Sequence, residues 1–397
     1  MWADVNCTYY APEYLGEKVW IVVVFGSVVA VVSLLENSVV FLVLLCNRQF
    51  FFSNMFFNLA IAALDMIIAV CYLLLFSVET LADFLLDVRL HKLWHAYLRP
   101  LFTVGHVSLA ASAFVIIAAT SERLLTTLKS NYAGFRQRQR YFAVTIPFVA
   151  ALLFKGTVFF EVHVLTNDHC HDTMVMHFAF PTNLTLLNVD YRKFWMFYAR
   201  NIATVLLPFI VLSAMNVIVV IWLQRRVLAT EQERRLSAMT GEIPHESDLL
   251  LAAKMRANAR TATITTLCIV MTWLIANSLS VIFTVWEFLD KENLQSHRKF
   301  FVLGRDVLNI LSVSAGCFRL PIYLRGNAEF RRKVLEICCC RPSENIKDSG
   351  CGEKLKYTSE NFYTSEFTSN SLKLIVENGT NGTRCTCHEE TTADVFL

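Results

Sequence analysis

The sequence predicts an all-α membrane protein, in which a bundle of seven transmembrane helices precedes a short amphipathic helix on the membrane surface and a disordered tail. The chain has 397 residues, of which 55% are hydrophobic and only 17% are charged, whereas soluble proteins carry about 25% charged residues. A helix needs about 20 residues to cross the hydrocarbon core of a bilayer. Seven apolar runs are long enough, at residues 19–45, 55–78, 98–121, 141–161, 194–223, 261–286 and 301–324.

Basic residues between these runs predict the orientation. With the N-terminus outside, the three short inner loops contain twelve lysines and arginines and the outer loops contain seven, and cytoplasmic loops carry the excess of such residues. We therefore expect residues 1–18 to be extracellular, residues 19–324 to form the bundle in the plasma membrane, and the C-terminus to be cytoplasmic. Glycosylation sequons at Asn6 and Asn183 then lie on the outer side.

The segment after the last run predicts a helix on the inner leaflet. Apolar residues from Phe330 to Ile337 share one face and three basic residues share the other, a pattern typical of helices that bind anionic lipid headgroups. We assign residues 325–340 to this helix and to three juxtamembrane cysteines that are candidates for palmitoylation, namely Cys338, Cys339 and Cys340. Residues 341–397 are rich in Ser and Thr and have little apolar periodicity, so we expect a disordered cytoplasmic tail.

Charge and cysteine patterns exclude other classes of protein. The net charge is only +3, and no basic stretch alternates with aromatic residues, so we expect no nucleic-acid partner. Twelve cysteines occur without paired CxxC spacing, which argues against a disulfide scaffold or a zinc ribbon. We expect neither a cofactor nor a bound metal.

Polar residues inside the apolar runs are costly in hydrocarbon and are therefore functional candidates. Asp65 lies in the middle of the second run, and Asn37 lies one run away. A buried acid in this place is a candidate to hold a sodium ion or to exchange a proton between conformers. The other polar positions in the runs are Glu36, Glu122, Arg123, Lys155, Arg200, Asp306 and Arg319.

The order of several residues resembles the rhodopsin-like (class A) G-protein-coupled receptors. The resemblance is carried by Asn37, Asp65, the pair Glu122-Arg123, Pro208, the run Pro321-Ile322-Tyr323, and Phe330. Shorter fragments, such as Phe159-Phe160-Glu161 and Trp286-Glu287, resemble the invertebrate FMRFamide-type neuropeptide receptors, especially those of nematodes. The resemblance implies a non-enzymatic receptor that binds an extracellular neuropeptide and activates a heterotrimeric G protein.

The resemblance also implies a switch at the cytoplasmic end, formed by Glu122, Arg123 and Tyr323. Glu122 is expected to pair with Arg123 while the bundle is closed. Agonist binding would shift the population toward an open bundle in which Arg123 faces the G protein.

The chain departs from the family pattern at several positions. Leu124 follows Arg123 where the family usually has Tyr, and the motif before Tyr323 lacks its Asn. Leu98 stands where the family has a cysteine at the outer end of the third helix, while a cysteine remains in the second outer loop. Cys7 and Cys170 are candidates to pair in its place.

A peptide ending in Arg-Phe-amide would need an acid for the guanidinium and aromatic side chains for the ring. The acids at the outer ends of the runs are Glu161, Glu287 and Asp306, and the aromatic candidates are Tyr198, Trp195 and Trp286. Arg200 either faces a ligand carboxylate or pairs with Glu161.

The tail suggests regulatory partners. Its Ser and Thr residues lie near acids and are suitable kinase substrates, so a phosphorylated cluster is a candidate to bind arrestin. The last three residues, Val395-Phe396-Leu397, fit the groove of a PDZ protein.

Two other classes of protein stay open. A seven-span zinc hydrolase would need about three protein ligands and an acid, and a transporter would need inverted repeats or broken helices. Six histidines lie at or near the outer side, at His91, His95, His106, His169, His171 and His177.

Overall fold

The structure, a computed structural model, describes residues 7–47, 50, 55–128, 134–240, 246–290, 293 and 296–338. Within these residues, seven helices are long and apolar enough to cross a membrane. Each overlaps one of the seven predicted runs, which confirms the predicted fold class. We number these helices as spans 1 to 7, at Leu15–Cys46, Phe56–Leu85, Val88–Leu128, Gln137–Phe160, Tyr191–Arg225, Thr263–Leu289 and Arg298–Gly326.

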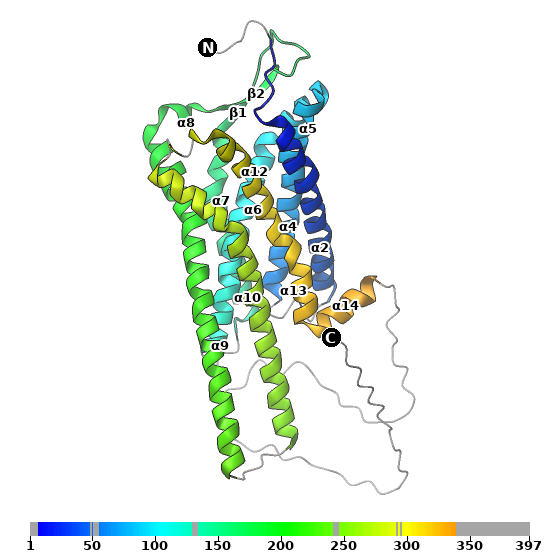
Figure 1. Cartoon of the computed structure of the whole chain (residues 1–397), viewed down its shortest axis with the longest axis vertical. Coiled ribbons are helices and arrows are strands. Elements are labelled where there is room, and N and C mark those ends of the chain that lie inside the picture. The colour runs from blue at the N-terminus through cyan, green and yellow to red at the C-terminus, as the bar shows by residue number, and fades with distance from the viewer. Residues whose placement is uncertain are drawn as a thin grey trace. The chain divides into compact units, whose positions relative to one another are not determined.

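Several spans contain more than one helical geometry. Spans 1, 2 and 5 include π-helical turns, which often mark functional positions in a helix. In the labels of Figure 1, the helical elements of the spans are α1 (Leu15–Lys18), η1 (Val19–Gly26), α2 (Ser27–Cys46), α4 (Phe56–Tyr72), η2 (Leu73–Ser77), α5 (Val78–Leu85), α6 (Val88–Leu128), α7 (Gln137–Lys155), η3 (Gly156–Phe160), η4 (Tyr191–Ala199), η5 (Ile202–Leu206), α9 (Leu207–Thr240), α10 (Glu246–Leu289), α12 (Arg298–Ser314), η6 (Ala315–Phe318) and α13 (Arg319–Gly326).

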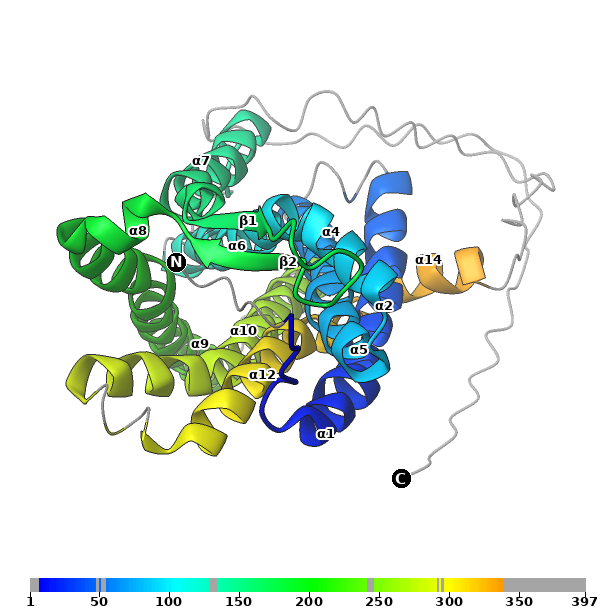
Figure 2. The same cartoon turned by 90° about the horizontal axis from the view of Figure 1, so that it is seen from above.

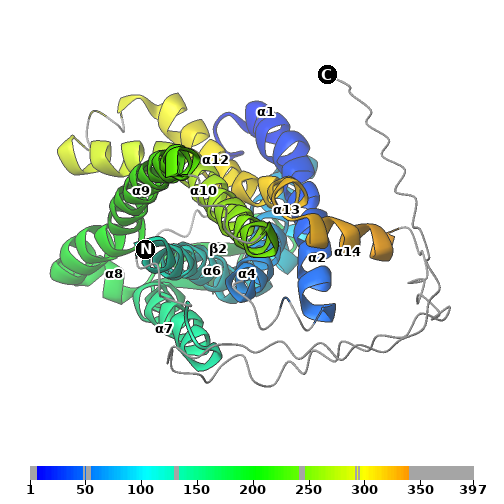
Figure 3. The same ribbon diagram turned by 90° about the horizontal axis from the view of Figure 1, so that it is seen from below.

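Helix α6 is the central helix of the bundle and packs against α4, α7 and α9 (Figure 3). Its buried face includes a stretch of small residues, because Ser108, Ala110, Ala111, Ser112 and Ala113 are all nearly inaccessible to solvent. Small side chains allow helix backbones to approach closely in a membrane, where packing drives association. Large apolar side chains of the neighbouring helices, such as Phe57, Ile61, Leu212 and Trp273, complete this core.

A β-hairpin lies across one end of the bundle, where it passes over α6 (Figure 2). Strand β1 (Val162–Thr166) pairs antiparallel with β2 (His177–Pro181), with Val162 opposite Pro181 and Thr166 opposite His177. A short helix, α8 (Asn183–Leu187), follows β2 and includes Asn183. A disulfide joins Cys7 to Cys170 in the turn of the hairpin, with the two Cα atoms 5.5 Å apart.

The last helix, α14 (Ala328–Cys338), leaves the end of α13 at an angle to the bundle (Figure 3). Phe330 is fully buried, and its ring lies 5.6 Å from that of Tyr323, which is also fully buried. One face of α14 thus packs on spans 1 and 7, while Leu335 is exposed. Asn6, Cys339, Cys340 and the tail from 341 to 397 lie outside the described residues, as does the side chain of Cys338.

Candidate functional site

Asp65 is paired with an arginine inside the bundle. The Arg319 Nε and the Asp65 Oδ2 form an ion pair, and the Arg319 Nη2 donates a hydrogen bond of 3.3 Å to the Asp65 Oδ1. Asp65 is 6% exposed and Arg319 is 2% exposed, so both charges lie in the interior. Helices α4 and α13 are thereby joined in the core.

Ser33, Asn37 and the backbone of Gly316 lie beside Asp65. The Asn37 side chain donates to the backbone carbonyl of Ser33 at 2.8 Å and to that of Gly316 at 3.2 Å. A Cβ atom at Gly316 would collide with the Ser33 hydroxyl and would lie 3.5 Å from the Asp65 Oδ2. The expected sodium site is therefore corrected, because the Arg319 guanidinium supplies the positive charge that pairs with Asp65.

At the end of span 3 that lies away from the hairpin, the expected pair of Glu122 with Arg123 is also corrected. The Glu122 Oε1 accepts hydrogen bonds from the Arg140 Nη2 at 3.1 Å and from the Phe135 backbone N–H at 2.8 Å. Adjacent residues on a helix do not face each other, so the acid of α6 faces the start of α7 instead. Glu122 of span 3 thus binds both Arg140 in the first turns of span 4 and the backbone of Phe135 just before that span.

Arg123 therefore lacks the partner that the family pattern implies. Its side chain is half-buried, and among the described residues it has no ion pair. Tyr323, the third predicted switch residue, packs against Phe330 and the buried residues of α2 instead. The described structure thus does not bring the three predicted switch residues into one cluster.

At the end of span 4 next to the hairpin, Glu161 is fully engaged with other side chains. The Arg200 Nη1 lies 2.6 Å from its Oε1 and 2.9 Å from its Oε2. The Tyr191 hydroxyl donates to the same Oε1 at 2.9 Å, and Glu161 is only 5% exposed. Arg200 therefore pairs with Glu161, which removes this acid from the candidates for a free ligand contact.

The other predicted ligand residues are dispersed. Asp306 forms an ion pair of 3.8 Å with Lys18 of span 1. Tyr198 packs 5.2 Å from Phe288, Trp195 stacks 5.9 Å from Phe154, and Trp286 lies 5.9 Å from Phe300, in each case between ring centroids. Glu287 is half-buried on α10. None of these side chains lines either of the two cavities that lie between spans 2 and 3.

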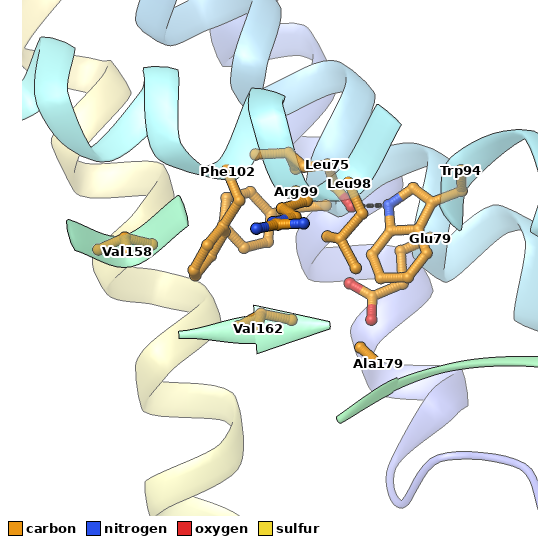
Figure 4. A pocket seen from close by; sticks show the side chains of 10 residues that line it. Leu75, Glu79, Trp94, Leu98, Arg99, Phe102, Val158, Val162 and Ala179 are labelled. Carbon is orange, nitrogen blue, oxygen red and sulfur yellow. Dashed lines mark hydrogen bonds between the residues drawn. The ribbon is translucent and has the colours of Figure 1, made fainter. Parts of the chain in front are cut away.

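The larger cavity lies between spans 2 and 3 and the hairpin, with a volume of about 210 Å³. Its apolar wall includes Leu75, Phe76, Trp94, Leu98 and Phe102. The Trp94 indole N–H donates a 2.8 Å hydrogen bond to the Leu75 carbonyl, which fixes the indole plane. Val162 and Ala179 of the hairpin form the opposite side (Figure 4).

Two charged side chains line this cavity, and neither was predicted from the sequence. The Glu79 carboxylate points toward the space between Trp94 and Ala179 (Figure 4). Arg99 donates from its Nε to the Phe159 carbonyl at 2.6 Å, and its guanidinium lies 4.0 Å from the centre of the Phe159 ring. Among the described residues, Glu79 has no ion pair and no hydrogen-bond partner.

A smaller cavity of about 50 Å³ lies deeper, between spans 2, 3 and 7. It shares Leu75, Phe76 and Phe102 with the larger cavity, so these three side chains separate the two spaces. His106 lines it and packs edge-on against Phe102 at 4.4 Å between ring centroids. The two cavities therefore lie on either side of these three side chains, the larger one beside the hairpin and the smaller one farther into the bundle.

Three histidines gather beside the larger cavity. The rings of His91 and His95 lie 4.3 Å apart, and those of His95 and His177 lie 6.1 Å apart. Burial, together with the charges of Lys92 and His91, lowers the pKa of His177 on β2 below its usual value. Within the described residues, no group of three His, Cys, Asp or Glu side chains is arranged to hold a metal ion.

No family model and no curated protein matches the chain. Among solved structures, the fold is similar to the crystal structure of squid rhodopsin, with a TM-score of 0.58 and 12% sequence identity, over 84% of this chain and 90% of that chain. At this identity the match shows the fold alone. The chain therefore has a rhodopsin-like fold, and its seven membrane-length helices indicate a multi-pass membrane protein.

Glu79 was not predicted as a site residue, because the second predicted run ended at residue 78 and the carboxylate therefore lay outside the expected bundle. In the structure span 2 continues to Leu85. Arg99 lies one residue inside the predicted third run. A charge at the boundary of a run is expected to face the headgroups, so Arg99 was not predicted as a site residue. The available signal was the spacing itself, since both charges lie within one turn of a predicted outer end.

Proposed function

We propose that this protein is a G-protein-coupled receptor that binds an extracellular neuropeptide, an amidated FMRFamide-like peptide, and activates a heterotrimeric G protein. The observation that carries the proposal is a rhodopsin-like fold with a charged, aromatic cavity near one end of α6 and an unpaired arginine at the other. Trp94 and Arg123 are separated by about 43 Å along this helix, at 1.5 Å per residue. Ligand and G protein would thus bind at opposite ends of one continuous helix.

The size of the cavity favours a peptide whose end enters the bundle. Sites for drug-sized ligands usually have about 300–1,000 Å³, which exceeds the 210 Å³ of this cavity. One terminal group would fit, and the rest of the ligand would lie over the hairpin. The aromatic residues Trp94 and Phe102 supply the apolar surface that such a group needs.

The transduction step follows from packing. A ligand shifts the receptor only by binding the open bundle more tightly than the closed one. Span 3 contributes to the cavity wall and also bears Arg123, so it connects both events. A G protein that accepts Arg123 would select the open bundle.

The test is a screen of cells that express the receptor against a panel of amidated peptides, with calcium and cAMP as readouts. We expect one or more peptides ending in Arg-Phe-amide to evoke a response that is absent from cells without the receptor. A receptor at the cell surface that responds to no peptide in the panel would contradict the ligand class. A zinc-dependent hydrolytic activity, together with zinc in the purified protein, would favour a membrane hydrolase. Uptake of a small molecule into the cells would favour a transporter.

Further proposals concern orientation and modification. The excess of basic residues in the inner loops supports an extracellular N-terminus with glycans on Asn6 and Asn183. With this orientation, the segment that follows α14 lies on the inner side, which supports palmitoylation of Cys338, Cys339 and Cys340. The composition of the tail supports binding of arrestin after phosphorylation and of a PDZ protein at the C-terminus.

A further inference from the structure

The outer half of the bundle contains several acids, and they differ in whether they are already paired. Arg200 holds Glu161 through two short contacts, and Lys18 pairs with Asp306. Glu79 is the acid that lines the larger cavity, and it has no hydrogen bond or ion pair among the described residues. A carboxylate in an apolar cavity is costly unless a partner neutralises it.

The charges nearest to Glu79 increase its demand for a cation. Asp83, Asp306 and Lys18 lie within electrostatic reach of Glu79. The carboxylates of Glu79, Asp83 and Asp306 therefore share the ammonium group of Lys18, which already pairs with Asp306. The His91 ring lies 4.0 Å from Asp83 and balances that acid only when it is protonated.

The other charge of the cavity does not neutralise Glu79. Arg99 is directed to the Phe159 carbonyl and stacked on the Phe159 ring, and it forms no ion pair with Glu79 among the described contacts. In Figure 4, Trp94 lies beside Glu79, whereas Phe102 lies on the other side of the cavity, beside Arg99. Aromatic faces attract cations and add to the attraction of a carboxylate.

From this geometry we propose that the cavity lined by Glu79, Trp94 and Phe102 is a subsite for a cationic group of the ligand, either a guanidinium or an ammonium. The cation forms a charge-assisted hydrogen bond with Glu79 and lies against the aromatic rings. The proposal names the acid that contacts the ligand and so deepens the proposed function. It replaces Glu161 and Asp306 in that role, because their charges are already compensated.

The first experiment needs no ligand. Ala179 is exposed and lines the cavity, so Ala179→Cys introduces a thiol opposite Glu79 in the full-length receptor. Its rates of modification by a cationic trimethylammonium methanethiosulfonate and by an anionic sulfonate methanethiosulfonate are compared, with the parent receptor as the blank. We expect the ratio of cationic to anionic rates to fall by about tenfold when Glu79→Gln is added.

Glu79→Gln keeps the side-chain size and removes an unpaired charge, so folding is expected to be preserved. The matched control is Asp290→Asn, which removes an exposed acid at the outer end of α10. This control should leave the ratio unchanged. An unchanged ratio in Glu79→Gln, or an equal fall in both variants, would overturn the assignment of Glu79.

The second experiment uses Phe-Met-Arg-Phe-amide and the same peptide with citrulline in place of arginine. In the parent receptor, the arginine peptide should be about tenfold more potent, and in Glu79→Gln the two peptides should be equally potent. Equal potency in the parent would overturn a cation subsite for this ligand. If neither peptide activates the parent, the proposed ligand class fails, while the labelling ratio still decides whether the cavity selects cations.

Discussion

Arg319 of span 7 forms a buried ion pair with Asp65 of span 2, and this pair occupies the place where the sequence suggested an exchangeable cation. Arg319 lies four residues before Tyr323 on the same helix and brings a fixed positive charge into the interior of the bundle. Its consequences for stability and for ion sensitivity can both be measured.

We first predict a large loss of stability when only one partner of this pair is removed. Arg319→Gln leaves Asp65 buried and unpaired, which is expected to cost about 3–5 kcal/mol of unfolding free energy. The double variant Asp65→Asn with Arg319→Gln should recover most of that loss, because no isolated charge remains. Thermal unfolding of the purified receptor in detergent measures both.

The control for this prediction is Arg298→Gln. Arg298 pairs with Glu13 at 2.6 Å, but both side chains are largely exposed. An exposed pair contributes about 0–1 kcal/mol, so this variant should unfold nearly as the parent does. If the double variant at 65 and 319 is as unstable as Arg319→Gln, the two residues do not act as a pair.

The second prediction is that sodium does not alter agonist binding. The Arg319 guanidinium already pairs with Asp65, and the Gly316 backbone lies close beside both Ser33 and Asn37. Peptide affinity should therefore be the same in sodium and in a large organic cation at equal ionic strength. A reduction of affinity in sodium that disappears in Asp65→Asn would show that an ion reaches this acid.

The third prediction concerns coupling to the G protein. Under the proposed function, Arg123→Ala should keep surface expression and peptide binding but abolish peptide-evoked signalling, because the Arg123 side chain has no ion pair with any described residue. Arg140→Ala is the contrasting variant, since Arg140 holds Glu122, and it should lower expression or thermal stability. Full signalling by Arg123→Ala at normal surface levels would contradict the assigned role.

The fourth prediction concerns the disulfide that attaches the N-terminal segment to the hairpin. Cys7→Ser and Cys170→Ser should each lower the unfolding free energy by about 2–5 kcal/mol. The double variant should be no less stable than either single variant, because one bond is lost in all three. Unfolding is compared with and without a reducing agent, and additive losses would mean that the cysteines act separately.

The sequence alone was sufficient for the membrane spans of this fold and for the helix that follows them, but it did not predict the β-hairpin or α8. Seven apolar runs predicted seven spans, and the alternation of apolar and basic residues after residue 328 predicted a helix where α14 lies. These predictions succeed because the length and polarity of a membrane helix are imposed locally by the bilayer. The ends of the spans were less accurate, since helices such as span 3 continue beyond the apolar run.

Only the tertiary structure decided which charges meet. Arg319 and Asp65 are 254 positions apart in the chain, Glu122 turns to Arg140 instead of its neighbour, and Glu79 remains unpaired in a cavity. Each outcome depends on how a helix is rotated about its axis and on which helices lie beside it. Polarity along the chain determines that a charge must find a partner in hydrocarbon, whereas packing between distant helices determines which partner it finds.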